Sequence, residues 1–230
     1  LLIAEGKTTL DTPAVTHLPS LDDQYPLYAE ITMRHLASMT SGYQGQKPKD
    51  RATDEMAFLT PGAPYFEPAG TQVLYRDDQP YLLAQILTRL TGKSLKETFK
   101  QRIADPIGMV NWDWGVVGVL DNGIALNNAP GHSELTSAWK GKEGIQTTAR
   151  EMARFGHLYL NRGNWNGKQL LPASFVDVAT RNQGPVAGGS SFLHGRYGFY
   201  WWTNEFMPNG KRPWPSAPPK TYTTHGHNCN

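Results

Sequence analysis

Several features are scarce in this 230-residue chain, and each scarcity excludes a class of protein. Cys229 is the single cysteine, so no disulfide can form within the chain. No apolar run approaches the ~18 residues of a membrane-spanning helix. A formal net charge of +2 is too small to indicate nucleic-acid binding. With 39% hydrophobic and 18% charged residues and no repeats, the composition is that of a globular protein with one core.

The most informative segment is residues 65–109, because it combines a turn, a tyrosine and two helical patterns. A Pro-x-Gly sequence at residues 68–70 indicates the turn. Leucine and isoleucine then recur at helical spacing, which predicts a helix over residues 78–91. A Thr-Gly pair ends that pattern, and a second helix is expected over residues 94–104.

Tyr75 occupies the turn immediately before the first of these helices. A helix N-terminus stabilises an anion, so a phenol there is expected to lose its proton more readily. Tyr75 is therefore the leading candidate for a catalytic group. The alternative is a partly buried tyrosine that closes the turn.

Short blocks along the whole chain match, in order, the pattern of a known enzyme family. Within residues 65–109 the blocks are EPAGT (67–71), YRD (75–77), LTGKS (90–94) and DPIGM (105–109). Elsewhere they are GKTTLDTPAV (6–15), ITMRHLASMTSG (31–42), GIQTTAREMARFG (144–156), WNGKQLL (165–171) and YGFYWW (197–202). On these blocks the chain resembles the serine β-lactamase-related superfamily, which includes class C β-lactamases, penicillin-binding DD-peptidases and related esterases.

The resemblance implies an α+β fold of the β-lactamase/transpeptidase type, with a helical region beside an antiparallel sheet flanked by helices. It also implies that Tyr75 acts as general base and proton relay during acylation. Asp77 stands where the family has asparagine, and an ionised carboxylate accepts hydrogen bonds but donates none. Asp77 is thus a changed catalytic-site residue, or it caps the helix that begins at residue 78.

The end of the chain, THGHNCN (224–230), is the candidate for the family's third motif. The resemblance assigns a substrate-binding role to His227 or, in the other alignment, to His225. Asn228 and Cys229 then replace glycines of the family pattern. A different interpretation is that His225, His227 and Cys229 share one face of a strand and bind zinc. No fourth ligand is evident, so neither a metal nor a cofactor is predicted.

The family's nucleophile, the serine of a Ser-x-x-Lys at the start of a buried helix, has no clear counterpart. Ser137-Ala138-Trp139-Lys140 has the spacing, but it lies in a polar stretch and follows Tyr75, whereas the family places the nucleophile first. Tyr159-Leu160-Asn161 matches the family's Tyr-x-Asn, but packing of an amphipathic helix explains it better. We therefore expect residues 1–230 to be one β-lactamase-related domain that lacks its nucleophile segment and C-terminal strands.

The expected function of the parent protein is a serine hydrolase that cleaves an ester or amide through an acyl-enzyme. Esterase or peptidase-like activity is favoured over efficient β-lactamase activity, because both the asparagine and the Lys-Thr-Gly of the family are replaced. Small esters, β-lactams or peptides are the expected partners, with no nucleic acid and no membrane span. The alternative is a non-catalytic binding or scaffold member of the same fold. The resemblance favours a periplasmic or secreted location.

Outside residues 65–109 the pattern predicts fewer elements. Helices are expected near residues 32–39, 51–59, 148–162 and 172–180, strands near 197–203 and 221–228, and a Pro-rich surface loop over 208–220. Residues 112–128 give no clear prediction. Adjacent residues of a strand face opposite sides, so Trp201 and Trp202 are not expected both to be covered. The two strands are expected to expose an unpaired edge and an apolar face.

Overall fold

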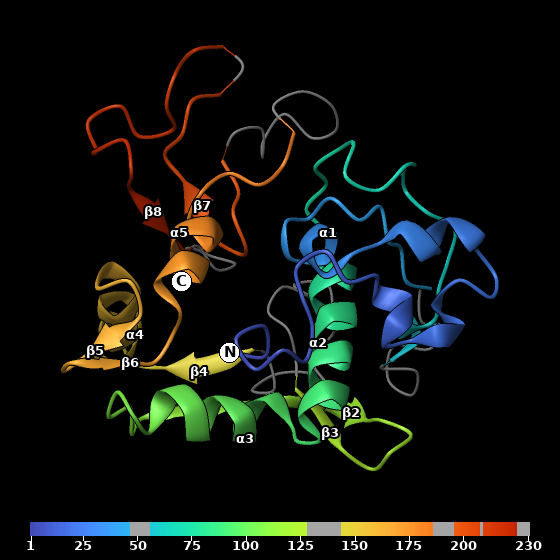
Figure 1. The fold of residues 1–230 in the computed structure, drawn as a ribbon, viewed down its shortest axis with the longest axis horizontal. Coiled ribbons are helices and arrows are strands. Elements are labelled where there is room, and N and C mark those ends of the chain that lie inside the picture. Colours follow the sequence, from blue (N-terminus) through green and yellow to red (C-terminus); the bar gives the residue numbers. More distant parts are fainter. Residues whose placement is uncertain (47–55, 128–143, 186–195, 208, 225–230) are drawn as a thin grey trace.

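Helix α2 (Asp78–Thr91) stands at the centre of the fold in the computed structural model, which describes residues 1–46, 56–127, 144–185, 196–207 and 209–224 (Figure 1). The 3-10 segments of residues 14–30 lie on one side of it, α4 (Ala149–Leu160) and α5 (Ala173–Ala179) lie on the other, and α1 (Met33–Ala37) lies at one end of it. The other helical segments are η1 (Ala14–Thr16), η2 (Pro19–Leu21), η3 (Pro26–Glu30), η4 (Ala57–Leu59), α3 (Leu95–Phe99) and η5 (Lys100–Ala104). Within these described residues no helix is long and apolar enough to cross a membrane.

The strands are short and pair antiparallel. β1 (Trp112–Trp114) pairs with β4 (Ile145–Thr147), β2 (Val116–Val119) with β3 (Ala125–Asn127), β5 (Asn164–Trp165) with β6 (Lys168–Gln169), and β7 (Trp202–Thr203) with β8 (Tyr222–Thr223). Helices beside antiparallel strands make an α+β fold, as the sequence predicts.

Helix α2 has the bounds that the sequence predicts, because local signals and burial agree there. Leu82 and Ile86, four residues apart, are fully buried on the face that packs into the main core. Gly92 ends the helix in the left-handed conformation, with φ of 64°, and its N–H donates to the carbonyl of Thr88. The Thr-Gly pair therefore stops the helix by backbone geometry.

The second predicted helix, residues 94–104, is present but changes its winding. Ser94 and Glu97 form a capping box at the start of α3. From Lys100 the backbone continues as the π-helical segment η5 to Ala104. The sequence predicts the bounds of this segment but not the change of winding.

The main core joins parts of the chain that are far apart in sequence. Its buried members come from the N-terminal segments, α1, α2, α5 and residues 199–201. Gly42 turns the chain after α1 with φ of 69°, and a Cβ on it would lie 2.4 Å from the carbonyl oxygen of Phe66. A glycine is therefore required at this turn both for its dihedral angle and for the close approach of residue 66.

Helices α1, α4 and α5 lie within the ranges 32–39, 148–162 and 172–180 that the sequence predicts. Of the helix expected near 51–59, residues 51–55 lie outside the described part, and η4 forms a 3-10 turn at its end. The described residues of the 208–220 loop contain no helix or strand, as expected.

The prediction that Trp201 and Trp202 cannot both be covered is wrong. They are 7% and 8% exposed, respectively. Trp201 packs against Tyr159 of α4, with ring centroids 4.6 Å apart, and against Tyr222 of β8. Trp202 lies on the other side of the strand against Tyr75 and Tyr197. Aromatic contacts therefore cover Trp201 as well as Trp202.

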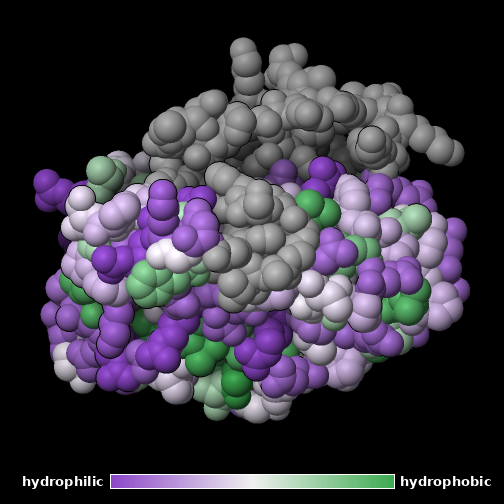
Figure 2. Space-filling model, turned by 90° about the horizontal axis from the view of Figure 1, so that it is seen from above, coloured by the Kyte–Doolittle hydropathy of each residue, from purple (hydrophilic) through white to green (hydrophobic). Residues whose placement is uncertain are grey.

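The edges of β7 also have partners within the described residues. β8 pairs with one edge through Trp202 and Thr223. On the other edge the chain folds back at residues 196–198, where the N–H of Thr203 donates to the carbonyl of Arg196. On the face in Figure 2, outside the grey atoms, hydrophobic residues occur in small groups among hydrophilic ones. Both edges of β7 are therefore paired, so the expectation of an unpaired edge is wrong for this strand, and Trp201 and Trp202 are covered.

Candidate functional site

The segment before Tyr75 is fixed by an antiparallel run of backbone hydrogen bonds with residues 39–42. The N–H groups of Tyr65, Gly70 and Leu74 donate to the carbonyls of Gly42, Thr40 and Met39, respectively, at 2.7–2.9 Å. Gly70 makes its turn with φ of 86°, as the Pro-x-Gly sequence predicts. Two blocks that the sequence separates by about 30 residues are thus tied together directly beside Tyr75.

Gln79 strengthens this connection from inside helix α2. Its side chain is 1% exposed; Oε1 accepts hydrogen bonds from the N–H and hydroxyl of Ser41, and Nε2 donates to the carbonyl of Leu74. A buried amide with its donor and acceptor both paired is costly to disturb. Gln79 therefore positions the backbone next to Tyr75, a role that the sequence does not reveal.

Tyr75 lies against two aromatic side chains, those of Tyr197 and of Trp202 in β7. Its ring stacks on that of Trp202, with centroids 6.1 Å apart and planes inclined by 20°, and meets the ring of Tyr197 edge-on at 6.0 Å. These contacts hold the ring, while 41% of the residue stays exposed. The result is a tyrosine with a fixed ring and access to solvent.

Burial raises the pKa of the Tyr75 phenol above its usual value of 10.0, and the negative charge of Asp77 raises it further. The expectation of a more acidic phenol is therefore wrong. The ring is desolvated by its aromatic neighbours, and a carboxylate two residues away opposes a second negative charge. In this environment Tyr75 is a neutral hydrogen-bond donor at pH 7.

Asp77 does not cap α2 through its side chain. It occupies the N-cap position, but with φ of −69° and ψ of −21° it is already helical, and its side chain makes no capping hydrogen bond. An N-cap residue normally has extended dihedral angles that direct its side chain to the first N–H groups. The capping interpretation is thus wrong, and the catalytic-site interpretation stays a prediction.

The neighbouring Asp78, which no sequence pattern singles out, is the buried acid of this turn. It is 5% exposed; its Oδ2 accepts a hydrogen bond from the N–H of Gly45 at 3.4 Å and lies 3.9 Å from the guanidinium of Arg76. Asp78 therefore ties the start of α2 to the segment after Gly42.

The strand that leads to the third motif pairs with β7, whose Trp202 stacks on the Tyr75 ring. Trp202, on which Tyr75 stacks, pairs with Thr223 in β8. His225 and His227 follow Thr223 by two and four residues, and both lie outside the described residues, as do Cys229 and residues 137–140. Tyr75 thus lies against β7, and the strand that precedes these histidines is the strand paired with β7.

Two further expectations concern metal binding and Tyr159. Among the described residues no group of three or more His, Cys, Asp or Glu side chains could hold a metal ion. Tyr159 packs in the core against Trp201 and Phe155, so the packing interpretation of Tyr159-Leu160-Asn161 is confirmed.

A family model described as Beta-lactamase matches residues 1–227, nearly the whole chain. The chain belongs to the beta-lactamase family. This membership confirms the serine β-lactamase-related resemblance drawn from the ordered blocks, and with it a family of serine hydrolase type.

Solved structures share the fold of this beta-lactamase-family chain. A candidate beta-lactamase from Bacteroides dorei has a TM-score of 0.63 and 21% identity over 90% of this chain and 63% of its own. A candidate 6-aminohexanoate-dimer hydrolase from Bacillus anthracis has a TM-score of 0.65 and 23% identity over 98% and 57%. A novel penicillin-binding protein homologue from Caulobacter crescentus has a TM-score of 0.63 and 19% identity over 91% and 65%.

An uncharacterized protein of Alkalihalophilus pseudofirmus is 24% identical over 219 residues, which is 90% of this chain and 60% of that protein. The chain therefore spans 57–65% of the length of these relatives.

The raised pKa of Tyr75 gives a testable pH dependence. We expect its phenol, followed by NMR of carbon-13-labelled tyrosine and assigned with Tyr75→Phe, to titrate above pH 10.0. Because the folded pKa exceeds the unfolded one, the stability it contributes is complete below pH 10 and is lost as the pH rises through the folded pKa. Asp77→Asn is expected to lower this pKa, whereas Asp105→Asn, which removes a carboxylate that pairs with Lys100, leaves it unchanged. A Tyr75 pKa below 10.0 would contradict the account.

Proposed function

We propose that residues 1–230 supply the tyrosine-bearing part of a serine hydrolase site that cleaves an ester or an amide. The supporting observation is the stacking of Tyr75 on Trp202, whose strand partner Thr223 leads to His225 and His227. A partly exposed phenol against β7, whose paired strand β8 precedes two imidazoles, can serve a carbonyl substrate, with the phenol moving a proton and an imidazole donating a hydrogen bond to the substrate.

In the proposed reaction a serine oxygen attacks the substrate carbonyl carbon, the bond to the leaving group breaks, and the serine proton reaches the leaving group through Tyr75. Because burial and Asp77 keep the phenol protonated, Tyr75 needs a cation beside it before it can accept a proton. We propose that this cation and the serine come from a Ser-x-x-Lys outside these 230 residues, and that Ser137 is not the nucleophile.

Esterase or peptidase-like substrates fit the proposed site better than β-lactams turned over efficiently. Asp77 offers a charged acceptor where the family has an amide that both donates and accepts. Its charge repels a substrate carboxylate and favours a neutral ester or amide. One neighbour in structure is named a hydrolase of an amide dimer, which is the same chemical class. A periplasmic or secreted location is part of the proposal and rests on the family alone.

The second candidate is a non-catalytic binding member of the family, and the raised pKa of Tyr75 favours it. A phenol that stays protonated is a poor base but a good hydrogen-bond donor to a bound ligand. The two candidates differ in one respect: the enzyme requires a reactive serine in the natural full-length protein, and the binding protein does not.

Labelling with a fluorophosphonate probe separates these candidates. We expect the 230-residue chain to remain unlabelled and to hydrolyse neither p-nitrophenyl esters nor nitrocefin above background. The natural full-length protein is expected to be labelled at a serine outside residues 1–230 if it is the enzyme. Labelling of the 230-residue chain that disappears in Ser137→Ala would contradict the assignment of the nucleophile. An unlabelled full-length protein would favour the binding member.

A further inference from the structure

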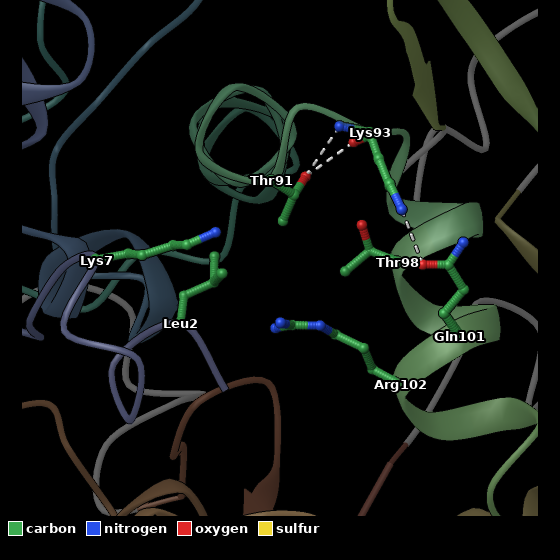
Figure 3. A pocket seen from close by; sticks show the side chains of 7 residues that line it. All are labelled: Leu2, Lys7, Thr91, Lys93, Thr98, Gln101 and Arg102. Atoms are coloured by element: carbon green, nitrogen blue, oxygen red, sulfur yellow. Dashed lines mark hydrogen bonds between the residues drawn. The ribbon is translucent and has the colours of Figure 1, made fainter.

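A polar cavity lies at the end of α2 opposite to Tyr75. Its volume is about 150 Å³, and it is lined by Leu2, Lys7, Thr91, Lys93, Thr98, Gln101 and Arg102 (Figure 3). The N-terminal segment, the end of α2 and the α3–η5 segment each form one wall. Helix α2 has 14 residues, so about 20 Å separate this cavity from Tyr75. The cavity is thus separate from the proposed catalytic site.

Three cationic side chains reach this cavity from different segments. Lys7, Lys93 and Arg102 extend toward the same space in Figure 3. Arg102 pairs with Glu5, whose Oε2 also lies 3.7 Å from the Lys7 ammonium, and the Lys93 ammonium donates to Gln101 at 3.0 Å. The positive charge of these three groups exceeds the charge of the carboxylate that pairs with two of them. An anion in the cavity would therefore be attracted.

Two atoms of the lining residues have unused hydrogen-bonding capacity. The hydroxyl of Thr98 and Nη1 of Arg102 are buried and have no hydrogen-bond partner within the described part of the chain. Buried donors without partners are rare because each costs free energy. The cationic groups of Lys7, Lys93 and Arg102 are hydrogen-bond donors that match the oxygens of an oxyanion.

We propose that this cavity, formed by Lys7, Lys93, Thr98 and Arg102, binds a small tetrahedral oxyanion, either inorganic phosphate or the phosphate of a small monoester. A volume of about 150 Å³ equals roughly five water molecules, which accommodates a phosphate with some water but no nucleotide. Donors approach from three walls, which suits a tetrahedral anion better than a planar carboxylate. The proposal does not depend on the proposed hydrolase activity.

The competing explanation is that the lysines only offset the negative end of the α2 dipole, which cations near a helix C-terminus do without any ligand. That explanation accounts for Lys93, which follows Gly92 directly. It does not account for Lys7 and Arg102, which reach the cavity from other segments of the chain. Lys7 is therefore the residue that best distinguishes the two explanations.

The test is isothermal titration of the chain with inorganic phosphate, glycerol 3-phosphate and acetate at matched ionic strength, with melting curves in parallel. We expect both phosphates to bind and acetate not to, with Tm rising by about 2–4 °C at a concentration of about five times Kd. Lys93→Met is expected to weaken phosphate binding roughly tenfold. Lys7→Met is expected to weaken phosphate binding by a similar factor, because its ammonium group reaches the cavity from the N-terminal segment.

Lys100→Met is the matched control, because it removes the same charge from a lysine that pairs with Asp105 and does not line the cavity. Phosphate affinity should be retained in this variant. Three results would overturn the proposal: no heat of phosphate binding, equal weakening by Lys93→Met and Lys100→Met, or acetate binding as tightly as phosphate. Preference for glycerol 3-phosphate over free phosphate would identify a monoester as the ligand.

Discussion

Replacing Tyr75 with phenylalanine is expected to lower kcat/KM for an ester substrate by about 100- to 10,000-fold in the natural full-length protein, the usual range for loss of an acid–base group. The variant keeps the ring stacked on Trp202 at 6.1 Å and edge-on to Tyr197, so the hydroxyl alone is lost. Steady-state kinetics with a p-nitrophenyl ester measures the effect. KM should change little, because the hydroxyl acts mainly in the transition state.

Tyr159→Phe is the matched control, since it removes the hydroxyl of a core tyrosine in a similar Tyr-x-Asn sequence. Its kcat/KM is expected to equal that of the unmodified protein. If Tyr75→Phe also retained full activity, Tyr75 would not be the proton relay, and the non-catalytic account of this surface would be favoured. Asp77→Asn provides a further comparison, because it restores the family's amide next to an unchanged tyrosine.

The second large effect is on stability. Trp201→Ala is expected to lower the free energy of unfolding by about 3–5 kcal/mol, the usual cost of truncating a buried large aromatic. Trp201 is 7% exposed and contacts Tyr159 at 4.6 Å, Tyr222 at 5.1 Å and Phe155 at 6.3 Å. Removing the indole opens a cavity between α4 and the β7–β8 pair. Urea denaturation followed by circular dichroism measures the loss.

Phe206→Ala is the control for this prediction, because Phe206 is an aromatic residue of the same region that is 64% exposed. It is expected to cost less than about 1 kcal/mol. If Trp201→Ala leaves too little folded protein to measure, Trp201→Phe should give an intermediate loss of about 1–3 kcal/mol. Losses equal to that of Phe206→Ala would mean that Trp201 is not part of the core.

Elements defined by neighbouring residues could be predicted from the sequence alone. The bounds of α2 follow from apolar spacing and from Gly92, which stops the helix by its own dihedral angle. The start of α3 likewise depends on residues that are close in sequence, since Ser94 and Glu97 form its capping box. The ordered blocks also indicated the family, because each block is a short run of neighbouring residues. These features depend on contacts only a few residues apart.

The sequence could not fix properties that depend on distant neighbours. The tertiary structure places Trp202 and Tyr197 around Tyr75, and this desolvation raises a pKa that proximity to a helix N-terminus alone would lower. Helix α4 and Tyr222 cover Trp201, although strand alternation alone suggested an exposed face. The polar cavity at the end of α2 likewise joins Lys7 to residues 91–102 across the fold. Local sequence therefore determined the helices and the family, whereas burial, which sums contributions from the whole chain, determined the electrostatics of the site.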